Sequence, residues 1–464
     1  MNDHRLIRMC TAAALCAVTG AEALAAGPYA LVAGRRDPAV TVIDLGKALL
    51  PANNATSNAV INRVRVTPDV DTNGDGTPDT PAAGLPSNIV IPPQGRYAYV
   101  VNHAGVATPA QVAFFQHGYA GNVAILDLKA ALNPINNGTL GAVKTWISTG
   151  AYGPVGLALT PDLGTALVTN SEGNGPEDGA RELNVLDLRS GQMVQSLALA
   201  LGNGGAVPQS PGKSCAALAN DPGSLPFASP AGDFGCFPNS NGIVISPMRG
   251  GYAFVANGGT DDVSVLEVRR LLAGQPGAEV RRIATGVGPW GLAINTAGSL
   301  VAVGNRESAE TGIEGNTISL IDVSQAISGQ ANPIVANVRV GTDGASTASR
   351  PFGLAFTPDG KRLLIANFRT NNLSVVDVRR AIAGDHQAEI ARIPLVRPNG
   401  GPARPRGVAS TPDGKFAVVS GGGSNASGGG TLWMVDIESA AVVATVTGVG
   451  NEPYLLQITQ GPAQ

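Results

Sequence analysis

The chain has 464 residues, of which 44% are hydrophobic and 14% are charged, and its formal net charge is −3. This balance provides no long-range attraction for nucleic-acid phosphates or for an anionic membrane surface, so a general nucleic-acid binder is disfavoured. The 61 glycines and 33 prolines fall short of a disordered composition and are typical of a fold with many turns.

The first residues have the pattern of a secretory signal. Arg5 and Arg8 precede the apolar run MCTAAALCAVTG, and small residues follow in AEALAAG, as a signal peptidase requires. Residues 1–26 are therefore predicted to be a cleaved signal peptide, which would place the mature protein in the periplasm or outside the cell. The run is too short for a stable membrane-spanning helix, and no later segment is predicted to be transmembrane.

A strand–turn–strand pattern recurs through the rest of the chain. A second strand follows each first strand, as in YAYVVN, ALVTN, YAFVAN and LLIAN, and a third strand closes each unit on an acid, as in AILDL, NVLDL, SLIDV and SVVDV. The six first strands, each with its turn, are SNIVIPPQGR (87–96), VGLALTPDLG (155–164), NGIVISPMRG (241–250), WGLAINTAGS (290–299), FGLAFTPDGK (352–361) and RGVASTPDGK (406–415).

A seventh unit is divided between the two ends of the chain. YALVAG (29–34) and VTVIDL (40–45) form a second and third strand without a first, whereas YLLQITQG (454–461) is a first strand with nothing after it. A ring explains both halves, because joining them removes the exposed edges of an open array. We therefore predict an all-β fold over residues 27–464, a seven-bladed β-propeller of four-stranded antiparallel blades, closed by the C-terminal strand joining the N-terminal blade.

The polar centre of FTPDGKRLLIAN indicates a tight turn, because Pro sets φ and Gly accepts a positive φ. Its recurrence favours a structural role over a catalytic one. The segments after the third strands, such as VRRLLAGQPG and VRRAIAGDHQ, each predict one helical turn. The acids at equivalent third-strand ends are predicted to accept turn hydrogen bonds: Asp44, Asp127, Asp187, Glu267, Asp322, Asp377 and Asp436.

The repeat resembles the YVTN family of β-propellers, whose tetrapeptide appears as YVVN (99–102), LVTN (167–170), FVAN (254–257) and LIAN (364–367). The resemblance covers nearly all of the predicted mature chain and implies the same ring of blades. That fold is shared by cell-surface proteins, periplasmic binding proteins, quinoprotein dehydrogenase subunits and lactone-handling enzymes, so the repeat alone does not choose a function.

The extra residues fall on one predicted face. They follow second strands or connect a fourth strand to the next first strand, and both connections emerge on the same side of a propeller. This elaborated face is where we expect a small anionic molecule or a protein partner to bind. The insertions are residues 67–86, 103–121, 171–182, 203–240, 306–315 and 421–430.

The segment DVDTNGDGTPD (69–79) has oxygen ligands at alternate positions in a glycine-bent loop, which is the arrangement that Ca²⁺ requires. It resembles calcium loops of the thrombospondin type-3 and EF-hand kinds, although either register lacks the acidic last ligand. A calcium ion that stiffens this loop is the predicted cofactor, and an acidic solvated turn is the alternative. The candidate ligands are Asp69, Asp71, Asn73, Asp75 and Asp79.

A second candidate site surrounds the predicted mouth of the central channel. Short Pro-containing junctions precede the first strands and place aromatic and arginine side chains around the axis. We hypothesise that this group binds an anionic or carboxylated ligand through guanidinium contacts, whereas local ion pairs with Glu307 and Glu452 are the alternative. The candidate residues are Trp290, Arg306, Arg350, Phe352, Arg369, Arg404, Arg406, Glu452 and Tyr454, with His117 from a neighbouring insertion.

Removal of the signal would leave two cysteines, Cys215 and Cys236. In an oxidising compartment they are predicted to form a disulfide that closes a loop of about twenty residues and stabilises the fold by roughly 3 kcal/mol. We find no GxSxG, phosphate-loop or dinucleotide motif.

Three functions remain open from the sequence. The first is a secreted or periplasmic, monomeric binding or interaction module. The second is a lactonase- or isomerase-type enzyme that uses arginine as electrophilic support and His117 or Glu452 as the acid or base. The third is an accessory subunit of a periplasmic oxidoreductase.

Overall fold

The computed structural model describes residues 27–69, 85–93, 95–103, 121–151, 153–171, 181–202, 215, 236–248, 251–307, 313–344, 346–424 and 429–461. Within these ranges, no helix is long and apolar enough to cross a membrane.

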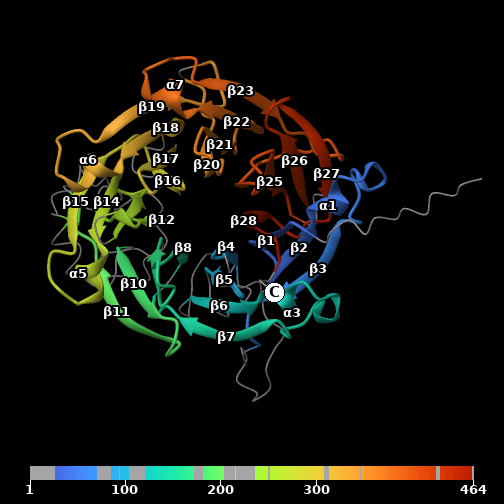
Figure 1. The fold of residues 1–464 in the computed structure, drawn as a ribbon, viewed down its shortest axis with the longest axis horizontal. Coiled ribbons are helices and arrows are strands. Elements are labelled where there is room, and N and C mark those ends of the chain that lie inside the picture. Colours follow the sequence, from blue (N-terminus) through green and yellow to red (C-terminus); the bar gives the residue numbers. More distant parts are fainter. Residues whose placement is uncertain are drawn as a thin grey trace, which may run out of the picture.

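Seven four-stranded antiparallel sheets stand around a central axis, as Figure 1 shows. The fold is the predicted seven-bladed β-propeller. From the axis outward, the blades are β28 (Pro453–Thr459), β1 (Tyr29–Gly34), β2 (Ala39–Asp44), β3 (Val60–Arg65); β4 (Pro86–Val90), β5 (Tyr97–Asn102), β6 (Asn122–Asp127), β7 (Val143–Ser148); β8 (Pro154–Leu159), β9 (Thr165–Asn170), β10 (Glu182–Asp187), β11 (Gln192–Ala198); β12 (Ser240–Ser246), β13 (Tyr252–Asn257), β14 (Asp262–Glu267), β15 (Glu279–Ala284); β16 (Pro289–Ile294), β17 (Leu300–Glu307), β18 (Glu314–Asp322), β19 (Ile334–Arg339); β20 (Pro351–Phe356), β21 (Arg362–Asn367), β22 (Asn372–Asp377), β23 (Glu389–Pro394); and β24 (Gly407–Ser410), β25 (Phe416–Gly422), β26 (Gly430–Asp436), β27 (Ala441–Thr447).

The two ends of the chain share one blade. β28 pairs antiparallel with β1, with Tyr29 opposite Thr459 and Val32 opposite Leu456, and β1 in turn pairs with β2. Figure 1 shows the red last strand beside the blue first strand. This pairing confirms that the seventh unit is divided between the ends and closes the ring.

Apolar side chains of neighbouring blades pack face to face and form the core. Between the fourth and fifth blades, for example, Phe254, Val263 and Val265 pack with Val301 and Val303, and all five are fully buried. Burying a side chain of this size stabilises the fold by about 1.5–3 kcal/mol relative to leaving it exposed. The period-two strands therefore derive most of their stability from contacts between blades.

In five blades the last residue of the second strand that pairs with the first strand is a fully buried asparagine, which joins strands within its blade. In the sixth blade Asn367 Nδ2 donates to Asn372 Oδ1 at 2.8 Å and to Ser374 Oγ at 2.7 Å. Asn305 Nδ2 donates in the same way to Thr317 Oγ1 and Ser319 Oγ, both at 3.0 Å. The repeated asparagine therefore has a structural reason, because a buried amide must find partners.

The Thr-Pro-Asp-Gly segment is a tight turn between the first and second strands. Thr357 Oγ1 donates to Asp359 Oδ1 at 2.7 Å, the Lys361 N–H donates to the same carboxylate oxygen at 3.0 Å, and the Gly360 N–H donates to Thr357 O at 2.8 Å. Gly360 has a φ of 69°, which a glycine adopts without strain. The predicted structural role of the motif is confirmed.

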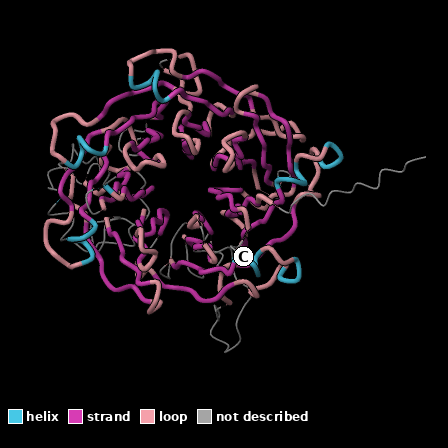
Figure 2. Tube along the Cα trace, in the orientation of Figure 1, coloured by secondary structure: helices cyan, strands magenta, loops and turns pink. Residues whose placement is uncertain are grey.

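The predicted helical turns after the third strands are present, and Figure 2 shows them at the outer edge of the ring. Third-strand acids cap them: Asp322 Oδ1 accepts the Gln325 N–H at 2.8 Å, and Asp377 Oδ1 accepts the Arg380 N–H at 3.0 Å. The short helices are α1 (Leu45–Ala48), α3 (Leu128–Ala131), α5 (Val268–Leu272), α6 (Val323–Ile327) and α7 (Val378–Ile382), and the 3₁₀ turns are η1 (Pro51–Asn53) and η2 (Pro134–Asn136).

Glu267 differs from the other third-strand acids, because it makes no side-chain cap hydrogen bond to its helix. Its carboxylate instead pairs with Arg269 and Arg270 of α5. The prediction of a turn hydrogen bond is therefore wrong for this acid.

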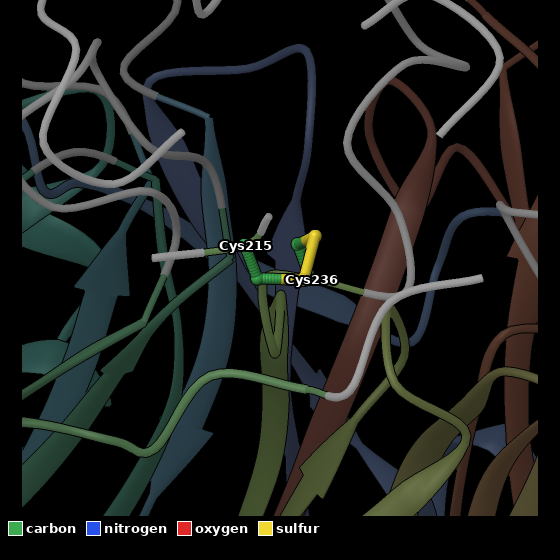
Figure 3. The surroundings of a disulfide bond; sticks show 2 residues. All are labelled: Cys215 and Cys236. Atoms are coloured by element: carbon green, nitrogen blue, oxygen red, sulfur yellow. A yellow bond between two sulfur atoms is a disulfide. The ribbon is translucent and has the colours of Figure 1, made fainter. Parts of the chain in front are cut away.

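Cys215 and Cys236 form the predicted disulfide, with an S–S distance of 2.05 Å (Figure 3). Cys236 is fully buried and packs with Phe237 and Leu201 beside the start of β12. The bond therefore joins two residues of the insertion at 203–240, and Cys236 lies just before β12.

Candidate functional site

Two rings of side chains surround one end of the channel. The face around this end, where second strands end and first strands begin, is called the mouth face here. The inner ring consists of the second residue of six innermost strands and, in the last blade, of Arg406, which directly precedes β24. The seven residues are Ser87, Val155, Asn241, Trp290, Phe352, Arg406 and Tyr454. The outer ring takes one residue from each blade. It is the residue that follows the last second-strand residue paired with the first strand: Arg35, His103, Ser171, Gly258, Arg306, Phe368 and Gly421.

Backbone hydrogen bonds hold the two rings together. The Arg306 N–H donates to Gly288 O at 3.1 Å, and the Phe368 N–H donates to Arg350 O at 3.1 Å. The accepting residue precedes an innermost strand and has a left-handed φ, which is 50° at Gly288 and 52° at Arg350. The same left-handed φ occurs at Leu85, Gly153, Asn239, Arg404 and Glu452.

Aromatic side chains of three blades meet at the axis. The ring centroids of Trp290 and Phe352 lie 4.1 Å apart, and Tyr454 meets Phe352 edge-on at 5.2 Å and Trp290 edge-on at 5.8 Å. Phe368 adds a fourth ring, 6.2 Å from Phe352. Trp290, Phe352 and Tyr454 are each at most 9% exposed, so the rings form a packed plug across the axis.

Three guanidinium groups lie over the faces of these rings. The Arg306 Cζ is 4.9 Å from the centre of Phe352, and the Arg35 Cζ is 5.0 Å from the centre of Tyr454. Arg406 is placed 5.0 Å from Phe368 and 5.9 Å from Tyr454. Cation–π attraction of about 0.5–2 kcal/mol for each pair helps to hold the charges in place.

Two of these three guanidiniums, those of Arg306 and Arg406, are only partly compensated. Burial lowers the pKa of both Arg306 and Arg406, because removal from water disfavours the charged form. Arg406 is 9% exposed, and its Nη1 donates to the Gly422 carbonyl at 3.3 Å. Arg306 keeps 24% of its side-chain surface accessible, and its Nη1 lies 3.6 Å from a Glu307 oxygen.

A separate ion-pair network lies beside the plug. Arg350 pairs with Glu307 and, at 3.0 Å, with Glu314, while Arg369 lies 3.6 Å from Glu314 and is 61% exposed. Glu307 and Glu314 belong to β17 and β18, which extend as a hairpin into the insertion predicted at 306–315. The alternative of local ion pairing therefore describes Arg350 best. Arg306 and Arg369 each lie 3.6 Å from a single glutamate oxygen, and Arg406 makes no ion pair within the described part of the chain.

The remaining predicted mouth residues lie further out. Glu452 pairs with Arg36 at 3.1 Å, which joins the last strand to the turn after the first. Arg404 is exposed, and its backbone N–H donates to Asn371 Oδ1 at 2.9 Å. Among the described residues, the mouth thus contains seven arginines and three glutamates. The arginines are Arg35, Arg36, Arg306, Arg350, Arg369, Arg404 and Arg406, and the glutamates are Glu307, Glu314 and Glu452.

Two contributors to the cluster were missed by sequence reasoning, Arg35 and Phe368. Both directly follow a second strand, in the same place as Arg306, so aligning the residue after each strand end provides the signal that identifies them. His117 and the calcium candidates Asp71, Asn73, Asp75 and Asp79 lie outside the described residues. Asp69 is described and pairs with Arg65.

No family model matches the chain, and no curated protein matches it significantly. Solved structures do resemble it. One, described as the periplasmic gluconolactonase of Pseudomonas aeruginosa, is 17% identical with a TM-score of 0.58, covering 94% of this chain and all of that one. A putative 6-phosphogluconolactonase of Bacteroides fragilis is 12% identical with a TM-score of 0.54, covering 93% of this chain and 98% of that one. A functionally unknown protein of Desulfotomaculum acetoxidans is 12% identical, with a TM-score of 0.54 and coverage of 94% and 100%.

The chain is therefore a seven-bladed β-propeller with lactonase-like propellers among its structural neighbours. At these identities the likeness extends to the fold alone. Membership of the YVTN family remains a prediction from the repeat.

Proposed function

We propose that the protein binds a small carboxylated molecule at the mouth of its channel. The observation that carries this proposal is the placement of Arg306 and Arg406, whose guanidiniums rest on aromatic faces and are largely withdrawn from water. A buried cation is costly when its charge is incompletely paired. An incoming carboxylate would supply the missing charge and accept fork-like hydrogen bonds from arginine.

Calorimetric titration tests this binding, with gluconate as the carboxylated probe and glucose as its uncharged counterpart. The wild-type chain should bind gluconate and not glucose. Arg306→Gln and Arg406→Gln should each weaken binding roughly tenfold to a hundredfold, because a hydrogen bond to a charged group contributes about 1.5–3 kcal/mol. Arg379→Gln is the matched control, since Arg379 is exposed on α7, away from the mouth face. Equal affinity in all four proteins would exclude the site.

Lactone hydrolysis is the second candidate, and the structural neighbours favour it. Water would add to the lactone carbonyl, the ring C–O bond would break, and the leaving alkoxide would take a proton, leaving a hydroxy acid. A guanidinium of the mouth would stabilise the developing oxyanion. The Glu452 carboxylate or the His117 imidazole would act as the acid or base.

A pH-stat assay with glucono-1,5-lactone distinguishes catalysis from binding alone. Acceleration above the spontaneous rate that falls at least a hundredfold in Glu452→Gln or His117→Ala would support the enzyme. If the wild-type chain binds gluconate but does not accelerate hydrolysis, the protein is a binding module.

Export to the periplasm is part of the same proposal. The signal-like residues 1–26 and the Cys215–Cys236 disulfide support it, because disulfides persist in oxidising compartments. Mass spectrometry of the protein from its native cells should find an N-terminus near residue 27 in the periplasmic fraction. Full-length protein in the cytoplasmic fraction would contradict export.

A further inference from the structure

Four of the short helices present a cation beside an apolar residue on their outward side. These helices follow third strands, so they lie on the face opposite the mouth, here called the turn face. Figures 1 and 2 show them spread along the rim of the ring. Two buried residues attach each helix to its blade: Leu45 and Ala48 in α1, Leu128 and Ala131 in α3, Val268 and Leu271 in α5, and Val378 and Ala381 in α7.

The outward apolar residues of this rim are exposed. Ile135 in η2, which follows α3, is 80% exposed, while Ile382 of α7 is 48% and Leu272 of α5 is 42% exposed. Leu49 and Leu50, which follow α1, are 39% and 40% exposed. A single exposed apolar side chain needs no explanation on a protein surface. Here the feature recurs at equivalent positions of the first, second, fourth and sixth blades, so it belongs to the rim as a whole.

The cations that accompany these residues protrude, whereas the nearby acids are recessed. Lys47, Lys129 and Arg379 are exposed, and none lies within ion-pair distance of a carboxylate in the described part of the chain. Asp44 and Asp127 are buried, and each accepts a backbone hydrogen bond from its own helix. The outermost charge on these helices is therefore positive, although the chain as a whole carries −3.

A shallow hollow on the sixth blade adds a cationic site to the same face. It lies between the first turn of the blade and α7 and is lined by Lys361, Arg362, Arg379 and Ile382, with Asp377 as its one carboxylate. That carboxylate is already paired with Arg362. Three cations against one paired acid fit a phosphate group, and Ile382 adds an apolar contact beside it.

A flat anionic surface fits this arrangement better than a protein partner does. The four helices occupy equivalent positions in blades around the whole ring, so a planar surface can contact all of them together (Figure 1). Protein–protein interfaces concentrate their binding energy in a central cluster. The exposed apolar residues of these helices lie at the rim, away from the axis.

We propose that the turn face docks on a bilayer that contains anionic phospholipids. Ile135, Leu272 and Ile382 would enter the headgroup region, and the neighbouring cations would contact phosphate groups, one of them in the hollow. Apolar side chains flanked by lysine and arginine are typical of binding at a membrane surface. A net charge of −3 gives no long-range attraction, so the docking is short-range and uses this one face. The mouth lies on the other face, and the proposal does not depend on the proposed function.

Flotation with lipid vesicles tests the docking. The chain should begin at residue 27, so that the apolar run of residues 1–26 does not contribute. It should bind vesicles of equal phosphatidylglycerol and phosphatidylcholine, and at least tenfold less to phosphatidylcholine alone. Raising NaCl from 0.05 M to 0.5 M should weaken binding several-fold, because salt screens the cations. Glycerol 3-phosphate at the concentration of the headgroups should not displace the protein, because it offers no apolar region to the rim.

Two variants identify the face that docks. Ile135→Gln should weaken binding to the anionic vesicles roughly tenfold, since an apolar anchor is lost. Arg379→Gln should weaken it roughly fivefold, since one cation near an anionic surface is lost, while gluconate binding stays as in the wild-type chain. The matched controls are Val396→Gln and Arg339→Gln, because Val396 is 68% exposed and Arg339 is exposed at the mouth-face ends of β23 and β19. Both controls should bind vesicles as the wild-type chain does.

Four results would overturn the proposal. They are no binding to the anionic vesicles, equal binding to both kinds of vesicle, displacement by glycerol 3-phosphate, and equal loss of binding in the variants and the controls. If a variant does not fold, as judged by circular dichroism, Lys129→Gln takes its place, with a roughly fivefold loss expected. Gluconate binding at the mouth is measured without vesicles, so failure of one proposal leaves the other unaffected.

Discussion

Val32, in the first strand of the chain, pairs in antiparallel register with Leu456, in the last. Both side chains belong to one buried cluster, with Val32 fully buried and Leu456 4% exposed. The ring is therefore held closed by backbone pairing and by apolar burial together.

A chain that ends at residue 452 should lose this closure. Burial of Tyr454 and Leu456 alone contributes about 1.5–3 kcal/mol each, so the free energy of unfolding should fall by at least about 3 kcal/mol. Urea unfolding followed by circular dichroism measures the loss. A chain ending at residue 461 is the control, and a peptide of residues 450–461 should restore stability when added to the shorter chain. Equal stability of the two truncated chains would contradict ring closure by β28.

Asn367→Ala should destabilise the protein by about 2–3 kcal/mol. The change removes two buried hydrogen bonds and leaves the Asn372 Oδ1 and Ser374 Oγ atoms short of a donor. Gln387→Ala, at an exposed position after α7, should change stability by less than about 0.5 kcal/mol. Urea unfolding of both variants checks the prediction, and similar midpoints would show that the repeated asparagine is dispensable.

The turn carboxylates should make stability fall in acid. Hydrogen bonds from the Thr357 hydroxyl, and then from the Lys361 N–H, hold the pKa of Asp359 below its usual value. A carboxyl whose pKa is lower in the folded state contributes stability above its unfolded pKa of about 3.9 and loses it as the pH falls through the folded value.

Asp359→Asn should therefore reduce the difference in unfolding free energy between pH 6 and pH 3. The side chain is 52% exposed, so screening should keep this reduction below about 1 kcal/mol. Thr357→Ala, which removes the hydroxyl donor, should reduce the difference in the same direction. An unchanged pH dependence in both variants would rule out this source of acid sensitivity.

Arg404→Gly should be more stable than Arg404→Ala by about 1 kcal/mol. Arg404 has a φ of 43°, a left-handed conformation that costs a residue with a Cβ about 1–2 kcal/mol and costs glycine little. The greater freedom of glycine in the unfolded chain offsets part of that gain. Thermal unfolding of the two variants checks the order, and a less stable glycine variant would show that the left-handed residue is not strained.

Calcium should stabilise the protein if residues 69–79 form the predicted loop. For a dissociation constant of 0.1–1 mM, typical of extracellular sites, 10 mM Ca²⁺ would add roughly 1.4–2.7 kcal/mol to the unfolding free energy. Thermal unfolding with calcium and with a chelator measures this difference. Asp71→Asn and Asp75→Asn should abolish it, whereas Asp343→Asn, in another blade, should not. No calcium effect on the wild-type chain would leave the acidic turn as the better interpretation.

Some of the mouth residues could be predicted because they occupy the same position in successive repeats. Trp290, Phe352, Arg406 and Tyr454 share one position before or within a first strand, so the repeat alone brings them around one axis. Phe368 was missed because its role depends on side-chain contacts with Phe352 of its own blade and Arg406 of the next blade, which the repeat does not show.

The chain's own pattern determined the number of blades, the closing of the ring and the turn chemistry, because period-two strands and turn residues act over short distances in sequence. Only the tertiary structure decided that Arg306 and Arg406 rest on aromatic rings while Arg350 is neutralised by Glu307 and Glu314. The physical reason is that charge compensation and desolvation depend on distances between side chains from different blades.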